Sequence, residues 1–137
     1  MTVNWTVFVA EQWLLFSILA VLVAVFFWLE MNKGGKTLGH HEVTRLLNAG
    51  EAVLLDVREQ KEFSAGHIVD SINIPHNKLN ERISELEKHR SKTVIVVDKL
   101  GQHAGSAGKS LKDKGYSVAR LQGGISEWIG QNLPVVK

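Results

Sequence analysis

Hydrophobic positions follow two different patterns along this chain. From Trp13 to Leu29 the residues carry no charge and a single hydroxyl group, so a helix formed by this run is apolar on all sides. At ~1.5 Å rise per residue such a helix is about 25 Å long, slightly short of a ~30 Å hydrocarbon core. After residue 36, short β-type runs alternate with segments of helical periodicity. The pattern predicts one apolar helix followed by an α/β domain.

The apolar run has the features of a membrane anchor. A signal peptide has a basic first region and a small-residue cleavage site, and neither is present before Trp13 or around Trp28. A buried helix of a globular protein has a polar stripe, which this run lacks. Tryptophans near both ends are typical of membrane interfaces. We therefore expect a transmembrane anchor over 1–31 that contacts the lipid bilayer through residues 13–29.

Basic residues around the anchor predict its orientation. Lys33 and Lys36 follow the apolar run, and no Lys or Arg precedes it. Cytoplasmic flanks of membrane helices are enriched in basic residues. We therefore expect a single-pass protein with its N-terminus outside and its C-terminal domain in the cytoplasm.

The sequence that follows the anchor predicts a linker over 32–36 and a domain over 37–137. The strands are expected over 52–56, 71–75, 93–97 and 117–121, and the helices over 42–48, 60–65, 78–89, 103–114 and 125–129. Strands that alternate with helices form parallel pairs joined by crossovers, with helices on both sheet faces. Residues 93–97 are the most β-prone and are expected to form the central strand. Ligands bind beyond the carboxyl ends of such strands, which indicates the loop after Val97.

Composition excludes several classes of function. The formal net charge is +2, and acidic and basic residues interleave without a basic stripe, so nucleic acid is not an expected partner. The chain has no cysteine, so it forms no disulfide, which fits a reducing compartment. The six histidines show no metal-ligand spacing. We expect no metal and no cofactor.

Five segments occur in an order and spacing that resemble one known family. They are Leu55-Asp-Val-Arg-Glu59, Glu62-Phe63, Ala65-Gly-His-Ile68, Ser71-Ile-Asn-Ile-Pro75 and Gln122-Gly-Gly-Ile-Ser-Glu-Trp128. This set resembles a rhodanese homology domain, a family that moves sulfur on a cysteine persulfide. The resemblance implies a small parallel sheet flanked by helices. A single-span anchor followed by one such domain is also similar to a bacterial inner (cytoplasmic) membrane architecture.

The resemblance also implies where the reactive loop lies. In active members the central strand ends in a cysteine; a glycine follows three residues later, then an arginine and a serine. This chain matches the glycine with Gly101 but has Asp98, His103 and Ala104 at the other positions. The loop length is kept and its nucleophile is absent, so no catalytic residue is assigned.

The resemblance assigns two sets of residues. The expected binding loop comprises Asp98, Lys99, Leu100, Gly101, Gln102, His103 and Ala104. The expected structural motif comprises Asp56, Arg58, His67, Gly123, Gly124 and Trp128. Asp56 and Arg58 are expected to interact and brace the sheet beside the loop, and His67 to pack and hydrogen-bond beside it.

The residues of the loop leave several interpretations open. The Asp98 carboxylate either lies among the loop N–H groups as an internal anion, or turns away as a helix N-cap or hydrogen-bond acceptor. An aspartyl nucleophile needs a metal and acid–base neighbours that the sequence does not supply. His103 either replaces the missing arginine or has no role. Gly108-Lys109-Ser110 ends like a phosphate-binding loop, but its first glycine is missing, so we interpret it as helix packing.

Three hypotheses for function follow. The first is a catalytically inactive rhodanese-like module that binds a protein or a small anion at the cytoplasmic membrane face. The alternative is a sulfurtransferase-type protein in persulfide trafficking that uses a partner's cysteine. In the third, the anchor is the functional part. The thiol chemistry of the family requires a thiolate. This chain has no cysteine to supply one, which favours the first hypothesis.

Overall fold

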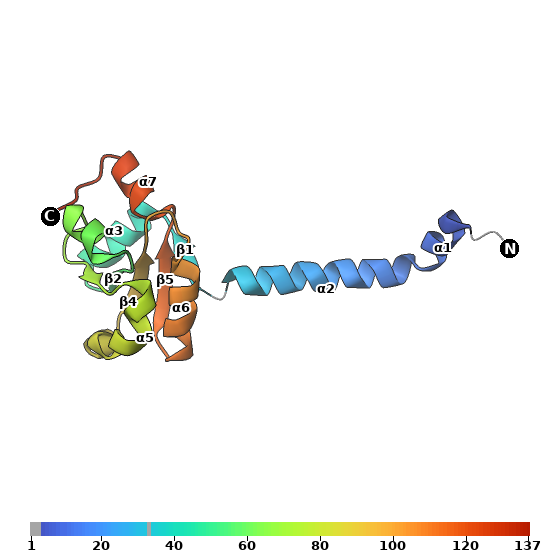
Figure 1. The fold of residues 1–137 in the computed structure, drawn as a ribbon, viewed down its shortest axis with the longest axis horizontal. Coiled ribbons are helices and arrows are strands. Elements are labelled where there is room, and N and C mark those ends of the chain that lie inside the picture. The colour runs from blue at the N-terminus through green and yellow to red at the C-terminus, as the bar shows by residue number, and fades with distance from the viewer. Residues whose placement is uncertain (1–3, 33) are drawn as a thin grey trace. The chain divides into compact units, whose positions relative to one another are not determined.

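The computed structural model describes residues 4–32 and 34–137 and divides the chain into two compact units, residues 1–32 and 33–137. The first unit consists of helix α1, Trp5–Glu11, and helix α2, Trp13–Asn32 (Figure 1). The Asn4 side chain caps α1 by accepting a hydrogen bond from the Thr6 N–H at 3.2 Å. The helices are separated at Gln12, beside the charged residue that interrupts the apolar pattern.

Helix α2 has the length and composition of a membrane span. Its stretch Trp13–Glu30 has a mean hydropathy of 2.3, and none of it is buried within the protein. A signal sequence near an N-terminus can have the same length and hydropathy, so this observation establishes an exposed apolar helix. The predicted helix over 13–29 is present in the structure.

The second unit contains a five-stranded parallel sheet with the order β1-β5-β4-β2-β3. The strands are β1, Lys36–Leu38; β2, Ala52–Asp56; β3, Ile72–Asn73; β4, Thr93–Val97; and β5, Ser117–Leu121. The helices of this unit are α3, His40–Asn48; α4, Gln60–Ala65; α5, Leu79–Arg82; α6, Ala104–Asp113; and α7, Gly124–Gly130. Two 3₁₀ helices, η1 over His76–Lys78 and η2 over Ile83–His89, flank α5. The α/β class and the central position of β4 are confirmed.

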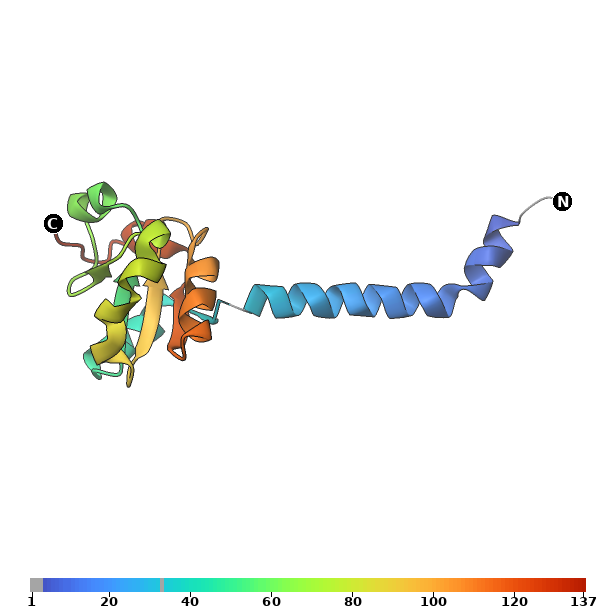
Figure 2. The same cartoon turned by 60° about the horizontal axis from the view of Figure 1, so that its bottom comes forward.

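Both faces of the sheet are covered, because successive side chains of a strand point to opposite sides. Val53 and Leu55 of β2 pack in a core with α5, η2 and α6, whereas Leu54 packs in a second core with α3 and α7. Figure 2 shows α5 and α6 on the same side of the sheet. Strands buried on both faces read as continuous apolar runs, which is why β2 and β4 were predicted with the bounds observed.

Several predicted elements differ from the structure. The strand predicted over 71–75 spans only Ile72–Asn73, the two residues that pair with β2. Strand β1 was missed, and its first residue, Lys36, had been assigned to the linker. Gly34 and Gly35 of that linker are buried, because the backbone at Gly34 packs directly against Gly105. The predicted α-helix over 78–89 is mostly 3₁₀. Residues three apart lie on one side of a 3₁₀ helix, so η2 directs both Ile83 and Leu86 towards the core.

Candidate functional site

The loop that follows β4 lies at the carboxyl end of the sheet and is held by helix α7. The N–H of Ile125 donates to the carbonyl of Asp98 at 2.8 Å, and the N–H of Ser126 donates to the carbonyl of Lys99 at 3.0 Å. The loop backbone therefore satisfies donors in the first turn of α7 that have no partner within the helix. This arrangement connects the predicted binding loop to the glycines of the predicted structural motif.

Gly123, the N-cap residue of α7, and Gly124, its first residue, permit this close approach. Gly123 and Gly124 have φ angles of 70° and 63°, in the left-handed region that favours glycine. A Cβ atom at Gly124 would overlap the carbonyl oxygen of Asp98 and would also meet the carbonyl oxygen of Lys99 at 2.7 Å. Any side chain at Gly124 therefore pushes the loop away from the helix.

Replacing Gly124 with alanine is expected to destabilise the domain by about 3 kcal/mol, the sum of the left-handed backbone penalty and the overlap with the loop. The measurement is urea denaturation of the full chain in detergent. Gly130→Ala is the matched control in the same helix, because a Cβ there has no neighbour within 4 Å. The control should stay within about 1 kcal/mol of the natural chain. Equal effects of the two substitutions would contradict the proposed packing.

The carboxylate of Asp98 occupies the interior of the loop. The residue is 2% exposed. One carboxylate oxygen accepts the N–H of Gly101, and the other accepts the N–H of His103 at 2.5 Å. His103 is itself the N-cap residue of α6 and makes no side-chain capping bond, so Asp98 is not the helix N-cap. Of the two interpretations left open by the sequence, the geometry matches an internal anion among backbone donors.

Asp56 and Arg58 form a buried ion pair beside this loop. Their side chains are 1% and 7% exposed, and Nη2 of Arg58 lies 2.7 Å from Oδ2 of Asp56. Arg58 also donates from Nη2 to the carbonyl of Gly66 at 2.8 Å. Asn73 donates from its side-chain amide to the carbonyls of Asp56 and Arg58, both at 3.0 Å. The pair thus connects β2, β3 and the segment after α4.

His67 and Trp128 hold the C-terminal segment. The backbone of His67 pairs with Val136 through bonds of 2.8 and 2.7 Å, and its Nδ1 lies 2.8 Å from the carbonyl of Phe63. Trp128 is buried, and its Nε1 donates to the carbonyl of Pro134 at 3.0 Å. Through these bonds both residues attach the C-terminal segment to the domain.

A small cavity of about 150 Å³ opens beside Asp98 and is also lined by Glu59, Glu62, His76 and His103. The rings of His76 and His103 stack at 4.0 Å with an interplanar angle of 3°. The sequence analysis missed His76 and both glutamates. His76 follows β3 and the glutamates follow β2, so the rule that sites form beyond strand carboxyl ends could have identified them.

The site offers limited chemistry. The chain has no thiol, and the described residues contain no cluster of three or more histidine, aspartate or glutamate side chains able to hold a metal. The Gly108-Lys109-Ser110 motif lies inside helix α6, and Gly108 is buried against the backbone of Gly34. A phosphate-binding loop would place these residues before the helix, so the packing interpretation fits the structure.

Comparison with known proteins is consistent with this geometry. The model of the rhodanese-like domain family matches residues 39–131. The chain belongs to the rhodanese-like family. The Escherichia coli (strain K12) protein YibN, described as uncharacterized, is 37% identical over 122 residues, which cover 88% of this chain and 84% of YibN.

Two further rhodanese-like relatives were found. A sulfurtransferase of Allochromatium vinosum is 32% identical over 93 residues, covering 67% of this chain and 85% of that protein. The crystal structure of a rhodanese-related protein from Thermoplasma volcanium superposes with a TM-score of 0.68 at 31% identity, covering 74% of this chain and 98% of that one. The rhodanese-like family therefore includes sulfurtransferases, whereas this member has Asp98 and no cysteine.

Proposed function

We propose that this chain is a catalytically inactive rhodanese-like module that binds a protein partner through the loop over residues 98–104 at the cytoplasmic membrane face. The observation that carries the proposal is the position of Asp98. Its carboxylate accepts two loop N–H groups, the type of donor that stabilises a sulfur anion or other bound anion. The loop therefore keeps its shape without a reactive group or a bound ligand.

The occupied loop donors favour a protein over a small anion. The cavity has a mixed lining, with the carboxylates of Glu59 and Glu62 beside Lys99 and Arg58, and Arg58 is already paired with Asp56. The Asp98 carboxylate already uses the N–H groups of Gly101 and His103 that an anion would need. Leu100 is 56% exposed in the middle of the loop. An exposed leucine on a loop held by internal hydrogen bonds suits a protein interface, because little conformational entropy is lost when it binds.

The proposed location follows from helix α2 and its flanks. An apolar helix of this length, with lysines only on its C-terminal side, supports a single-pass anchor in the bacterial inner membrane with the domain in the cytoplasm. The partner would then be a cytoplasmic protein or the cytoplasmic part of a membrane protein.

The Allochromatium vinosum relative supports a second candidate. Its name, sulfurtransferase, is consistent with a role for this chain in persulfide transfer with a cysteine that belongs to a partner. In that case the protein bound at the loop would carry a persulfide, which mass spectrometry of the captured protein detects.

Photo-crosslinking in intact cells tests the proposal. A photoreactive amino acid at the exposed position Gln102 is expected to give one discrete crosslinked band. Leu100→Asp should reduce the band at least about 10-fold, because a central apolar anchor contributes about 2 kcal/mol or more. Ile129→Asp is the control, since Ile129 is 51% exposed on α7 outside the loop.

Three results would contradict the proposal. One is the absence of any band while the domain is folded. Another is a band that Leu100→Asp and Ile129→Asp reduce equally. The third concerns location: protease added to spheroplasts should leave the crosslinked domain intact, and its digestion would exclude the cytoplasmic face.

A further inference from the structure

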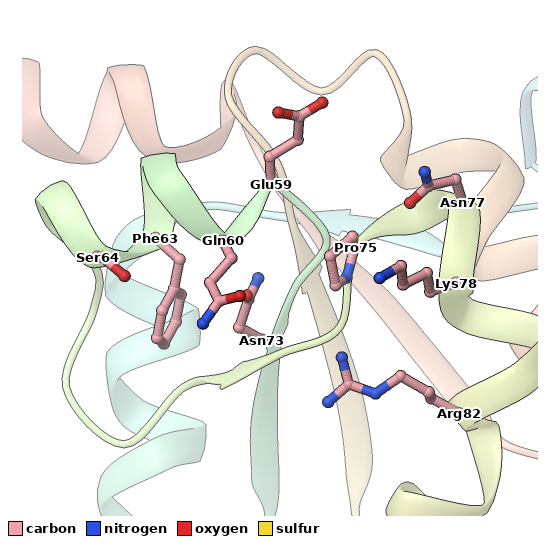
Figure 3. Close-up of a pocket in the computed structure, with 9 residues that line it drawn as sticks. All are labelled: Glu59, Gln60, Phe63, Ser64, Asn73, Pro75, Asn77, Lys78 and Arg82. Carbon is pink, nitrogen blue, oxygen red and sulfur yellow. The ribbon is translucent and has the colours of Figure 1, made fainter.

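A groove of about 600 Å³ lies between α4 and the segment formed by η1 and α5. Figure 3 shows Gln60 and Phe63 on the α4 side, Lys78 and Arg82 on the opposite side, and Asn73 of β3 between them. Glu59 lines both this groove and the small cavity beside Asp98, so the two sites adjoin. No residue of the groove belongs to the loop over residues 98–104.

The backbone between the groove walls belongs to an open sheet edge. Strand β3 lies at one edge of the sheet, and among the described residues it pairs with β2 alone. The N–H of Ile74 donates to the carbonyl of Asp56 at 3.1 Å, so the N–H and carbonyl of Asn73 point away from β2. Within residues 4–32 and 34–137 no group bonds to either of them. An exposed edge of this kind accepts an additional extended segment.

The same part of the chain already pairs with an extended segment of its own. A few residues before β3, His67 exchanges two backbone bonds with Val136 of the C-terminal segment in an antiparallel bridge. Asn73 therefore follows a stretch that already pairs with an extended segment, and its own N–H and carbonyl have no partner among the described residues.

The groove walls determine which side chains such a segment would carry. Lys78 forms no ion pair with a described residue, whereas Arg82 is bonded to Glu85 at 2.6 Å and lowers its pKa through that hydrogen bond. Phe63 is half-buried and offers an apolar wall opposite these cations. An extended segment that alternates acidic and apolar residues would be complementary to both walls, since alternate side chains point to opposite sides.

We propose that this groove binds an extended acidic segment of the protein partner, which pairs with the backbone of Asn73 and directs a carboxylate to Lys78 and Arg82. This inference rests on the proposed function, because the groove adjoins the loop and would hold another part of the same partner. The backbone bonds contribute affinity, and the two cations select an acidic over a basic segment.

The test uses the ¹⁵N-labelled full chain in phosphatidylcholine nanodiscs and a capped octapeptide that alternates valine and glutamate. Millimolar peptide is expected to shift the backbone amide of Asn73 and the side-chain amides of Gln60 and Asn73. The double variant Lys78→Glu/Arg82→Glu should weaken binding at least about 10-fold. Lys109→Glu/Lys112→Glu makes the same charge change on exposed residues of α6 and should bind normally.

Several outcomes would overturn the inference. They are the absence of shifts at Asn73, equal binding of a peptide with lysine in place of glutamate, and the same shifts with inorganic phosphate or with anionic lipid alone. Different results refute the proposed docking at the loop and the proposed binding in the groove. A Gln102 crosslink that Leu100→Asp removes, without peptide binding, refutes the groove alone. Peptide binding that depends on Lys78 and Arg82, without a crosslink at Gln102, refutes docking at the loop.

Discussion

The variant Asp98→Cys is expected to react with thiosulfate and hold a sulfur atom as a persulfide, whereas the natural chain does not react. The new thiol would face the N–H groups of Gly101 and His103 that now bind the carboxylate. Such donors stabilise a thiolate, so the pKa of this thiol should lie well below that of a free cysteine. The thiolate would attack the outer sulfur of thiosulfate and release sulfite.

Two measurements check this expectation. The pH profile of alkylation by iodoacetamide should have a lower midpoint for Asp98→Cys than for Leu100→Cys, whose thiol would be exposed in the same loop but away from the donors. Intact-mass spectrometry after thiosulfate treatment should show one added sulfur in Asp98→Cys alone. Equal alkylation profiles in the two variants would mean that the loop donors do not stabilise an anion at this position.

Removal of the cation from the buried Asp56–Arg58 pair is expected to be among the most destabilising substitutions in the domain. Arg58→Met leaves the Asp56 carboxylate, 1% exposed, without its charged partner. Breaking a buried pair in this way costs about 3–5 kcal/mol, a large part of the roughly 5–15 kcal/mol that stabilises a domain. Thermal denaturation should show a decrease in Tm of roughly 10–20 °C.

The control for this prediction is an ion pair at the surface with a similar distance between its charged atoms. Arg45 lies 2.5 Å from Glu42, but their side chains are 60% and 45% exposed, so Arg45→Met should cost less than about 1 kcal/mol. The double variant Asp56→Leu/Arg58→Met should recover much of the loss, because it removes the unpaired buried charge. A double variant as unstable as Arg58→Met would indicate that the bonds of Arg58 to neighbouring backbone, and not the charge pairing, hold this corner.

Much of the fold was predictable from local patterns. Strands β2, β4 and β5 were predicted with their observed bounds. For β2 and β4 the reason is that buried parallel strands are nearly continuous apolar runs. The apolar helix over 13–29 was equally clear. Strand β1 was missed because Lys36-Thr-Leu38 is short and only partly apolar; its extended shape is stabilised by pairing with β5.

The site could be predicted only in part. The order of motifs indicated the family and the loop, and the absence of cysteine came directly from the composition. The pair of His76 with His103 could not be predicted from spacing, because the two residues belong to different crossovers and meet only when β3 and β4 end at the same sheet edge. Glu59 follows β2 and could have been placed near the loop by the strand-end rule, but only the tertiary structure shows that it lines both the cavity and the groove.

By itself, the sequence determined the α/β class, the apolar helix and the loss of thiol chemistry, because these depend on residue type and periodicity. Only the tertiary structure decided what Asp98 does. A carboxylate after a strand can cap a helix or turn into its loop, and the choice depends on where backbone N–H groups converge. Here α7 holds the loop so that Gly101 and His103 direct their N–H groups at Asp98, and the carboxylate becomes a buried internal anion.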